Sequence, residues 1–165
     1  MADSALGNPP GRAAVVALSL CVKRAFSSTG ALMETVQTIF EQKYVHVGID
    51  HAAGILTARW IGFLQLDEVM EGSRVMGDAI RTHGLKRYLS DHTELKVLKA
   101  SVQNYLIGEA FPNYQRAGLE RVAVLSSGDV FTQATVENVN GQVTSNRLKF
   151  AVFPTREACY AWLLG

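Results

Sequence analysis

The side chains best placed to do chemistry follow two predicted strands, at the points where the hydrophobic residues of each strand end. They are Asp91, His92 and Thr93 after the first strand, and Ser126, Ser127 and Gly128 after the second. In open α/β sheets, ligands bind outside the carboxyl ends of the strands. The two loops would therefore form a small polar pocket, and the N–H groups of the helices that follow would suit an anion.

Each of these side chains also has a purely structural interpretation, which we prefer. Asp91 or Thr93 would cap the next helix, and Ser127 or Asp129 would cap the one after it, each stabilising by roughly 1 kcal/mol. His92 suggests acid–base work because histidine titrates near neutrality, but no nucleophile elbow accompanies it, so it is interpreted as a solvated loop histidine. Thr93 is a secondary candidate as a phosphoacceptor.

Other chemistries find little support in the sequence. No two of the four histidines have i, i+4 spacing, and Cys21 and Cys159 are far apart, so we expect neither a metal site nor a disulfide. Glycine-rich phosphate loops are absent, so we expect no cofactor. A modest basic patch would bind an acidic partner or phosphate, although a solvated charged face is the preferred interpretation. Its residues are Lys86, Arg87, Lys96, Lys99 and Arg121.

Composition narrows the class of protein. The 165 residues suggest one domain, and a net charge of +1 gives no field that would recruit nucleic acid. We expect a cytoplasmic protein without a membrane span, since the apolar run at residues 13–22 is shorter than the ~20 residues that a span needs.

The first 33 residues differ from the rest of the chain. An apolar run followed by small residues is open to interpretation as a secretory signal, but Asp3 precedes the run and Lys23 and Arg24 follow it, which is the wrong side for export. We prefer a disordered leader, or a start codon assigned too early with Met33 as the natural beginning. Residues 34–165 then form the single domain.

The elements that would position these side chains alternate along the chain. Period-two alternation predicts a hairpin of residues 44–49 and 55–61, while residues 36–40 extend or precede its first strand. A helix is predicted over residues 66–82, with a buried stripe that includes Leu66, Met70 and Gly77, and Gly84 is its predicted C-terminal cap. Further strands are predicted at residues 86–90, 120–125 and 148–152, and further helices at residues 95–117, 126–138 and 155–163. Pro112 predicts a kink or break near Phe111.

This order implies βα units, and several segments are similar to a known family. They are residues 84–91, Tyr105, Phe111-Pro112, residues 118–124, Asp129-Val130-Phe131, Phe150, and the last helix with Trp162. The domain resembles the STAS-like family, the fold of anti-sigma-factor antagonists, in its uncharacterised bacterial stand-alone branch. The resemblance implies an α/β fold: a mixed sheet of about five strands, an N-terminal antiparallel hairpin, and helices packed on the sheet.

The sequence departs from that family at its switch. In the antagonists the corresponding loop carries an Asp-Ser-Ser-Gly-type phosphorylation motif, whereas this loop reads Ser90-Asp91-His92-Thr93-Glu94. Ser126-Ser127-Gly128 occurs one strand later and is interpreted as a helix cap. The phosphoswitch of the family is therefore not expected at a serine.

The sequence thus favours a regulatory or protein-interaction module without catalytic activity, which recognises a partner protein through the edge that contains Asp91 and Thr93. A homodimer through the edge of the hairpin is also open, because unpaired edge strands invite pairing. The alternative is a small-ligand or lipid carrier with a pocket between the sheet and the first two helices. That pocket would be lined by residues such as Met70, Met76 and Tyr105.

Overall fold

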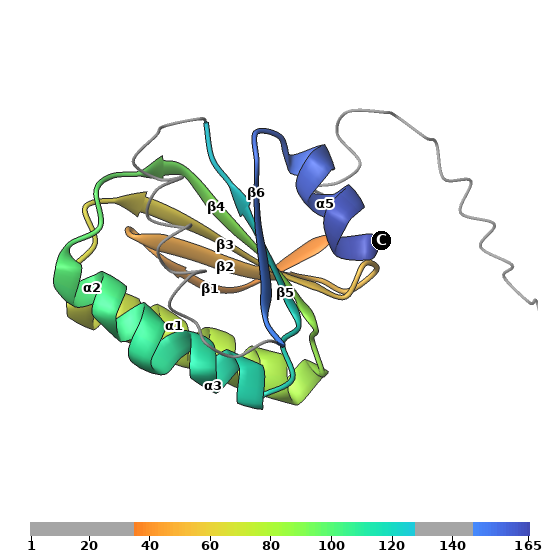
Figure 1. Cartoon of the computed structure of the whole chain (residues 1–165), viewed down its shortest axis with the longest axis horizontal. Coiled ribbons are helices and arrows are strands. Elements are labelled where there is room, and N and C mark those ends of the chain that lie inside the picture. Colours follow the sequence, from red (N-terminus) through yellow and green to blue (C-terminus); the bar gives the residue numbers. More distant parts are fainter. Residues whose placement is uncertain (1–34, 128–146) are drawn as a thin grey trace, which may run out of the picture.

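The computed structural model describes residues 35–127 and 147–165, which form a six-stranded mixed sheet with helices on both faces (Figure 1). The strands lie in chain order, antiparallel from β1 to β3 and parallel from β3 to β6. They are β1 (Val36–Gln42), β2 (Val45–Asp50), β3 (Ile55–Gly62), β4 (Arg87–Leu95), β5 (Arg121–Leu125) and β6 (Lys149–Phe153). The predicted mixed α/β architecture is confirmed. Gly128, the leader and almost all of the helix predicted over residues 126–138 lie outside the described residues.

One layer of helices covers one face of the sheet, and a single described helix covers part of the other (Figure 1). The first layer contains α1 (Leu66–His83), α2 (Ala100–Tyr105), the π-helical turn η1 (Leu106–Ala110) and α3 (Phe111–Arg116). The opposite face carries α5 (Arg156–Leu164), which contacts β4, β5 and β6. None of the described helices is long and apolar enough to cross a membrane.

The hairpin of β2 and β3 forms as predicted. Val45, Val47 and Ile49 of β2 belong to the core beneath α1, as do Leu56 and Ala58 of β3. The sheet has one strand more than the five predicted. This strand, β1, pairs with the edge of β2 that does not pair with β3, and it has a bulge between Thr38 and Phe40. Its weak alternation reflects its place at the edge, where its residues are exposed or half-buried. For this reason its pairing could not be assigned from the sequence.

Helix α1 has the predicted ends but buries a slightly different face. Its first turn is closed by a capping box between Gln65 and Glu68, and Gly84 ends it in the left-handed conformation at φ 61°. The predicted stripe is wrong at Leu66 and Met70, which are 37% and 45% exposed. The helix instead lays Gly72 against the sheet.

Gly72 permits this close approach. A Cβ atom there would lie 2.9 Å from Cη2 of Trp60, which is closer than packed carbon atoms tolerate. The buried face of α1 is rotated toward Gly72, because the bulky indole of Trp60 on β3 leaves no room for a side chain at that position of the helix.

Strand β4 is longer than the sequence predicts, and this changes the candidate site. It runs from Arg87 to Leu95 through Asp91, His92 and Thr93, and α2 begins only at Ala100 with Lys99 as its N-cap. The prediction that Asp91 or Thr93 caps this helix is therefore wrong. Pairing with β3 continues past the end of the hydrophobic run and ends where Lys96 N donates to Gly62 O over 3.0 Å.

The helical segment that contains Pro112 does not break. It passes from α2 through the π-helical turn η1 and continues as α3, which has Pro112 in its first turn. Proline lacks the N–H that an α-helix interior requires. The irregularity predicted near Phe111 is thus present as a π-helical turn, a feature that often marks functional sites.

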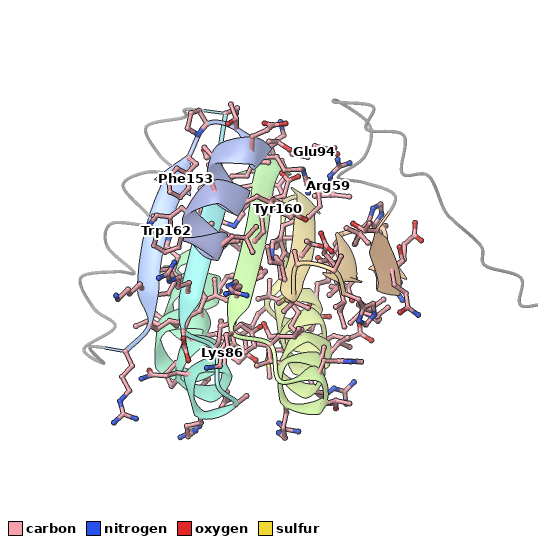
Figure 2. The ribbon with its side chains drawn as sticks, turned by 90° about the vertical axis from the view of Figure 1, so that its right-hand side faces the viewer. Arg59, Lys86, Glu94, Phe153, Tyr160 and Trp162 are labelled. Atoms are coloured by element: carbon pink, nitrogen blue, oxygen red, sulfur yellow. The ribbon has the colours of Figure 1, made fainter. Side chains whose placement is uncertain are left out.

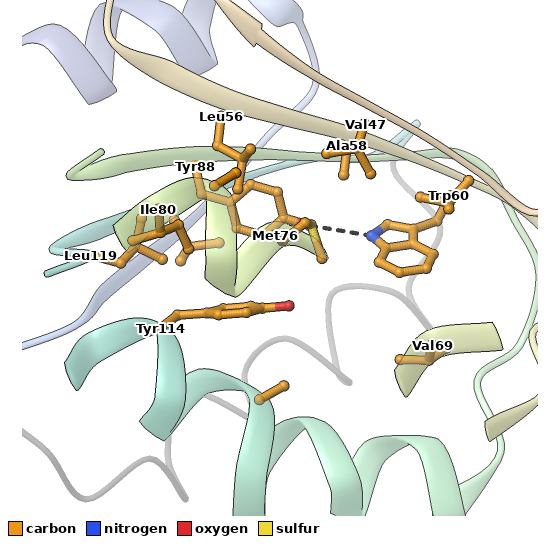
Figure 3. Close-up of a cluster of buried hydrophobic side chains, with 14 of the residues drawn as sticks. Val47, Leu56, Ala58, Trp60, Val69, Met76, Ile80, Tyr88, Tyr114 and Leu119 are labelled. Carbon is orange, nitrogen blue, oxygen red and sulfur yellow. Dashed lines mark hydrogen bonds between the residues drawn. The ribbon is translucent and has the colours of Figure 1, made fainter. Parts of the chain in front are cut away.

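Two hydrophobic cores lie on the two faces of the sheet. The larger core is shared with α1, α2 and α3, and Figure 3 shows part of it. The smaller core joins β4 and β5 to α5 through residues that include Leu89, Cys159 and Leu163. Cys159 and Leu163 of α5 are fully buried in this core, and Trp162 packs against it partly buried.

Candidate functional site

Asp91 and His92, which were predicted to lie together, are on opposite faces of the sheet. Successive residues of a strand point to opposite faces, so Ser90 and His92 face the helical layer of α1 to α3. Leu89 and Asp91 face the side of α5. The single pocket expected from adjacent loop residues does not form, because the residues lie in a strand and not in a loop.

An inner cavity of about 60 Å³ lies between the sheet and the helices α1, α2 and α3. Its walls are almost entirely apolar and come from β3, β4, β5, β6 and the helical layer. Apolar wall residues include Leu64, Val69, Met76, Leu98, Val102 and Leu106. The position of the carrier pocket, between the sheet and the helices, matches the alternative raised by the sequence.

Only one of the three residues predicted for that pocket lines it. Met76 contributes to the inner cavity, whereas Met70 and Tyr105 line an outer groove of about 570 Å³ between α1 and α3. Tyr114 forms part of both walls. Its hydroxyl and that of Ser73 are close enough to interact, but neither makes a hydrogen bond of standard geometry with another described residue.

Four polar side chains form a hydrogen-bond chain along the cavity, which we call the Trp60–His92 chain. Trp60 Nε1 donates to Tyr88 Oη over 3.2 Å (Figure 3), and Tyr88 Oη donates to Ser90 Oγ over 2.8 Å. Ser90 Oγ lies 2.8 Å from His92 Nε2. The second ring nitrogen, Nδ1 of His92, is buried and has no hydrogen-bond partner among the described residues.

Burial keeps His92 uncharged. Desolvation lowers the pKa of His92 to about 4, although Asp91 on the other face of the sheet raises it in part. The interpretation of His92 as a solvated loop residue is therefore wrong. Burial also raises the pKa of Tyr88, so its phenol keeps the proton that it donates to Ser90.

Asp91 anchors a separate cluster on the α5 side. Its carboxylate is nearly inaccessible and lies 3.0 Å from Arg156 Nη2 and 3.5 Å from Arg59 Nε. It also accepts hydrogen bonds from Thr93 N at 3.0 Å and Thr93 Oγ1 at 2.6 Å. Arg59 reaches Glu94 as well, at 3.3 Å, and Figure 2 shows both beside α5. Thr93 itself is exposed.

A shallow depression of about 190 Å³, the Asp91 hollow, lies beside this cluster. It is lined by residues of β1 to β4 and by Arg156, the first residue of α5. Ser126 and Ser127 do not line it. Ser126 does follow Leu125, the register partner of Asp91, so the end of β5 lies beside Asp91. Ser126 is buried and its N–H donates to Phe153 O, whereas Ser127 is exposed.

The predicted basic patch is not a continuous surface. Lys86 pairs with Glu120 at 2.9 Å, and Arg121 donates to Trp162 O and stacks over its ring. Lys99 donates to the side chain of Gln65. In the described part of the chain, no group of three His, Cys, Asp or Glu residues could hold a metal ion.

Trp60, Tyr88 and Ser90 were not predicted from the sequence as members of a site. One signal for them exists, because Tyr88, Ser90 and His92 share the two-residue spacing of one face of a strand. Three hydrogen-bonding side chains on a face expected to be buried indicate either a polar network or a binding site.

Comparison with known proteins supports the fold and goes no further. No protein-family model matches the chain, and no curated protein matches it. A solved structure from Shewanella loihica PV-4, described as an uncharacterized protein of the DUF3478 family with a SpoIIAA-like fold, is similar with a TM-score of 0.51. The similarity covers 77% of this chain and 99% of that chain, at 17% sequence identity. The chain therefore has the SpoIIAA-like, STAS-like fold that its sequence resembles.

Proposed function

We propose that this domain is a non-catalytic, cytoplasmic regulatory module that binds a small, largely apolar molecule in its inner cavity. One observation carries the proposal: the Trp60–His92 chain lies along the wall of an apolar cavity and ends at a buried nitrogen that has no partner among the described residues. Buried polar groups are almost always paired, because leaving one unpaired costs about 1–3 kcal/mol. An apolar pocket with a few convergent polar groups and a perturbed pKa is typical of a ligand site.

The size of the cavity limits the ligand. A water-sized group occupies about 10–15 Å³, so a volume of about 60 Å³ accepts only a molecule of few non-hydrogen atoms. A lipid chain does not fit. The structure therefore favours a sensor of small molecules over the lipid carrier that the sequence left open.

Ser90 and His92 have the spacing of a nucleophile and its base, yet catalysis is not the function that we propose. A general base works best with a pKa near the working pH, and the pKa of His92 lies at about 4. In serine hydrolases a carboxylate orients the histidine, whereas Asp91 lies on the opposite face of the sheet. His92 is thus a weak base without an orienting partner among the described residues.

Ligand binding can be tested with a panel of small fragments and NMR spectra of the full-length protein. We expect some fragments to shift resonances of cavity residues, with binding lost in Val102→Met, which fills the cavity with a flexible side chain. Met70→Phe changes the outer groove and serves as the matched control. Failure of every fragment to bind, or binding that survives Val102→Met, would contradict the proposal.

A second candidate function is recognition of a partner protein at the Asp91 hollow. It is favoured by two arginines, Arg59 and Arg156, that line the Asp91 hollow and hold a buried carboxylate there. Phosphorylation of Thr93 would break its 2.6 Å bond to Asp91 and place two negative groups together. Intact-mass measurement of protein from its native cells tests this step, and absence of a phosphorylated fraction under all growth conditions would refute it.

Self-association through β1 remains a further proposal. β1 lies at the edge of the sheet and pairs only with β2 among the described strands. Sedimentation analysis should show a dimer that a proline at Ile39 abolishes, since proline removes a backbone donor from an edge. A monomer at all accessible concentrations would exclude it.

A further inference from the structure

Two arginines in the Asp91 hollow share one carboxylate oxygen. Arg156 Nη2 lies 3.0 Å and Arg59 Nε lies 3.5 Å from the same atom, Oδ2 of Asp91. The other oxygen, Oδ1, accepts hydrogen bonds from the N–H and the hydroxyl of Thr93. Because both guanidinium groups contact a single atom, one buried carboxylate holds two cations close together.

The lining of the hollow carries more positive than negative charge. Among its described residues, Arg59 and Arg156 are cations and Asp91 is the one carboxylate, while His46 brings no negative charge. One positive charge is therefore left without a partner inside the hollow. Glu94 contacts Arg59 from outside the hollow, but its side chain is 50% exposed and water screens such a pair. An anion that enters the hollow would offset the repulsion between the two guanidinium groups.

Both arginines can be reached from solvent. The side chains of Arg59 and Arg156 are 38% and 23% exposed, and both line the hollow. A guanidinium group has five N–H donors. Arg59 contacts carboxylates through Nε and Nη1, so its Nη2 has no ion pair or hydrogen bond among the described residues. The contacts with Asp91 also hold both groups in place, so a ligand that binds them costs little additional side-chain entropy.

Much of the remaining wall is small or apolar. Val36, Gly48 and Ala58 contribute to it. Gly48 leaves no room for a side chain, because a Cβ atom there would lie 2.5 Å from Cγ1 of Val36. The volume of about 190 Å³ is below the roughly 300–1,000 Å³ of pockets for drug-sized molecules. The hollow therefore suits a smaller molecule with a short apolar body and one charged group.

We infer that the Asp91 hollow binds a small monocarboxylic acid, whose carboxylate bridges Arg59 and Arg156. The planar fork of a guanidinium group matches a carboxylate and binds it through charge-assisted hydrogen bonds. One negative charge balances the one positive charge left in the hollow, whereas a phosphate group would bring nearly two. The inference concerns a site apart from the inner cavity and does not depend on ligand binding there.

Acids and their amides, which are similar in size and differ in charge, test the inference. Butyrate with butyramide and benzoate with benzamide are titrated into the full-length protein and followed by NMR. We expect each acid to bind at least about tenfold more tightly than its amide, because hydrogen bonds between charged groups are the strong ones. The side-chain ¹H–¹⁵N resonances of Arg59 and Arg156 should shift with the acids. Those of Arg81, which pairs with Asp78 and does not line the hollow, should not.

A substitution at Arg59 tests the bridge. Arg59→Gln removes one of the two cations and leaves Asp91 paired with Arg156, so the acids should bind about tenfold more weakly. Arg81→Gln is the matched control, since it also removes a partly exposed, ion-paired arginine and should leave the affinity unchanged. Unchanged affinity in Arg59→Gln would overturn the inference, and the arginine resonances of the wild type test the contact without any variant.

The remaining outcomes separate the carboxylic acid from other occupants. Equal affinity for acid and amide, or acids that leave both arginine resonances unchanged, overturns the inference. Tighter binding of inorganic phosphate than of either acid overturns the carboxylate class. If a glutamate-rich peptide binds the two arginines at least about tenfold more tightly than either acid, the hollow recognises an acidic partner protein instead, as in the second candidate function.

The two proposed sites can be tested separately. Binding of the acids is followed at resonances of the Asp91 hollow, and binding of the fragments at resonances of the inner cavity. Val102→Met fills the inner cavity and should leave the affinity for butyrate unchanged. Loss of butyrate binding in Val102→Met would contradict a site in the hollow, whereas failure of the acids to bind at all leaves the proposed function of the inner cavity standing.

Discussion

Acidification should destabilise this domain through His92 alone by about 3 kcal/mol. Burial lowers the pKa of His92 from 6.5 to about 4 in the folded protein. Between these two values the unfolded chain binds a proton that the folded chain does not, so stability falls as the pH falls. A pKa difference of about 2.5, at 1.36 kcal/mol for each pH unit, corresponds to about 3 kcal/mol. The contribution is fully present above pH 6.5 and lost by about pH 4.

Urea unfolding between pH 7.5 and 4.0 measures this effect, because a non-titrating variant isolates one histidine from all other groups. We expect His92→Gln to lose about 3 kcal/mol less than the wild type over this range. His51→Gln is the matched control, since His51 is exposed, hydrogen-bonds to exposed Gln37 and contacts the ring of His83 edge-on. Parallel stability curves for wild type and His92→Gln, or an NMR titration of His92 near pH 6.5, would refute the assignment of a buried, neutral imidazole.

Three further substitutions, two of them with a matched control substitution, test the packing and the polar networks by chemical unfolding. Ser90→Ala interrupts the Trp60–His92 chain and should cost about 1–3 kcal/mol, whereas Ser73→Ala, which removes a hydroxyl without a standard partner, should change stability by less than about 0.5 kcal/mol. Gly72→Ala pushes a methyl group against an indole ring and should cost about 1–3 kcal/mol, while Gly108→Ala, with open space around it, should be neutral or stabilise by up to about 1 kcal/mol. Arg156→Met removes one of two cations from a buried carboxylate and should cost at least about 1 kcal/mol; an unchanged midpoint would show that the pair contributes nothing.

Much of the architecture was predictable because a strand or helix with one buried face has hydrophobic residues at regular intervals in its sequence. The alternation at residues 44–49 and 55–61 predicted the hairpin, and the apolar run at residues 122–125 is typical of a strand covered on both faces, as β5 is. Glycine at position 84 marked the end of α1 because its backbone adopts a left-handed conformation there. These signals depend on each segment alone, and the structure confirms them.

The candidate site was less predictable because its polar residues depend on neighbours far along the chain. Asp91, His92 and Thr93 have the composition of a loop, but β3 offers them backbone partners and extends the strand. Only the extended strand places His92 on one face and Asp91 on the other. The partners that decide their chemistry are distant: the indole of Trp60 begins the chain that reaches His92, and Arg156 comes from the last helix.

The sequence by itself thus determined the order of the described strands and helices from β2 onward, since hydrophobic periodicity is local information, and its resemblance to the STAS-like family indicated the fold. It also singled out the segment around Asp91 and His92 as the place where polar chemistry interrupts the core. Only the tertiary structure decided what that chemistry is. Packing of α1, α2 and α3 on the sheet leaves a cavity between them, removes water from His92 and places it at the end of a hydrogen-bond chain. Desolvation and hydrogen-bond direction are properties of that assembled environment, and no single segment carries them.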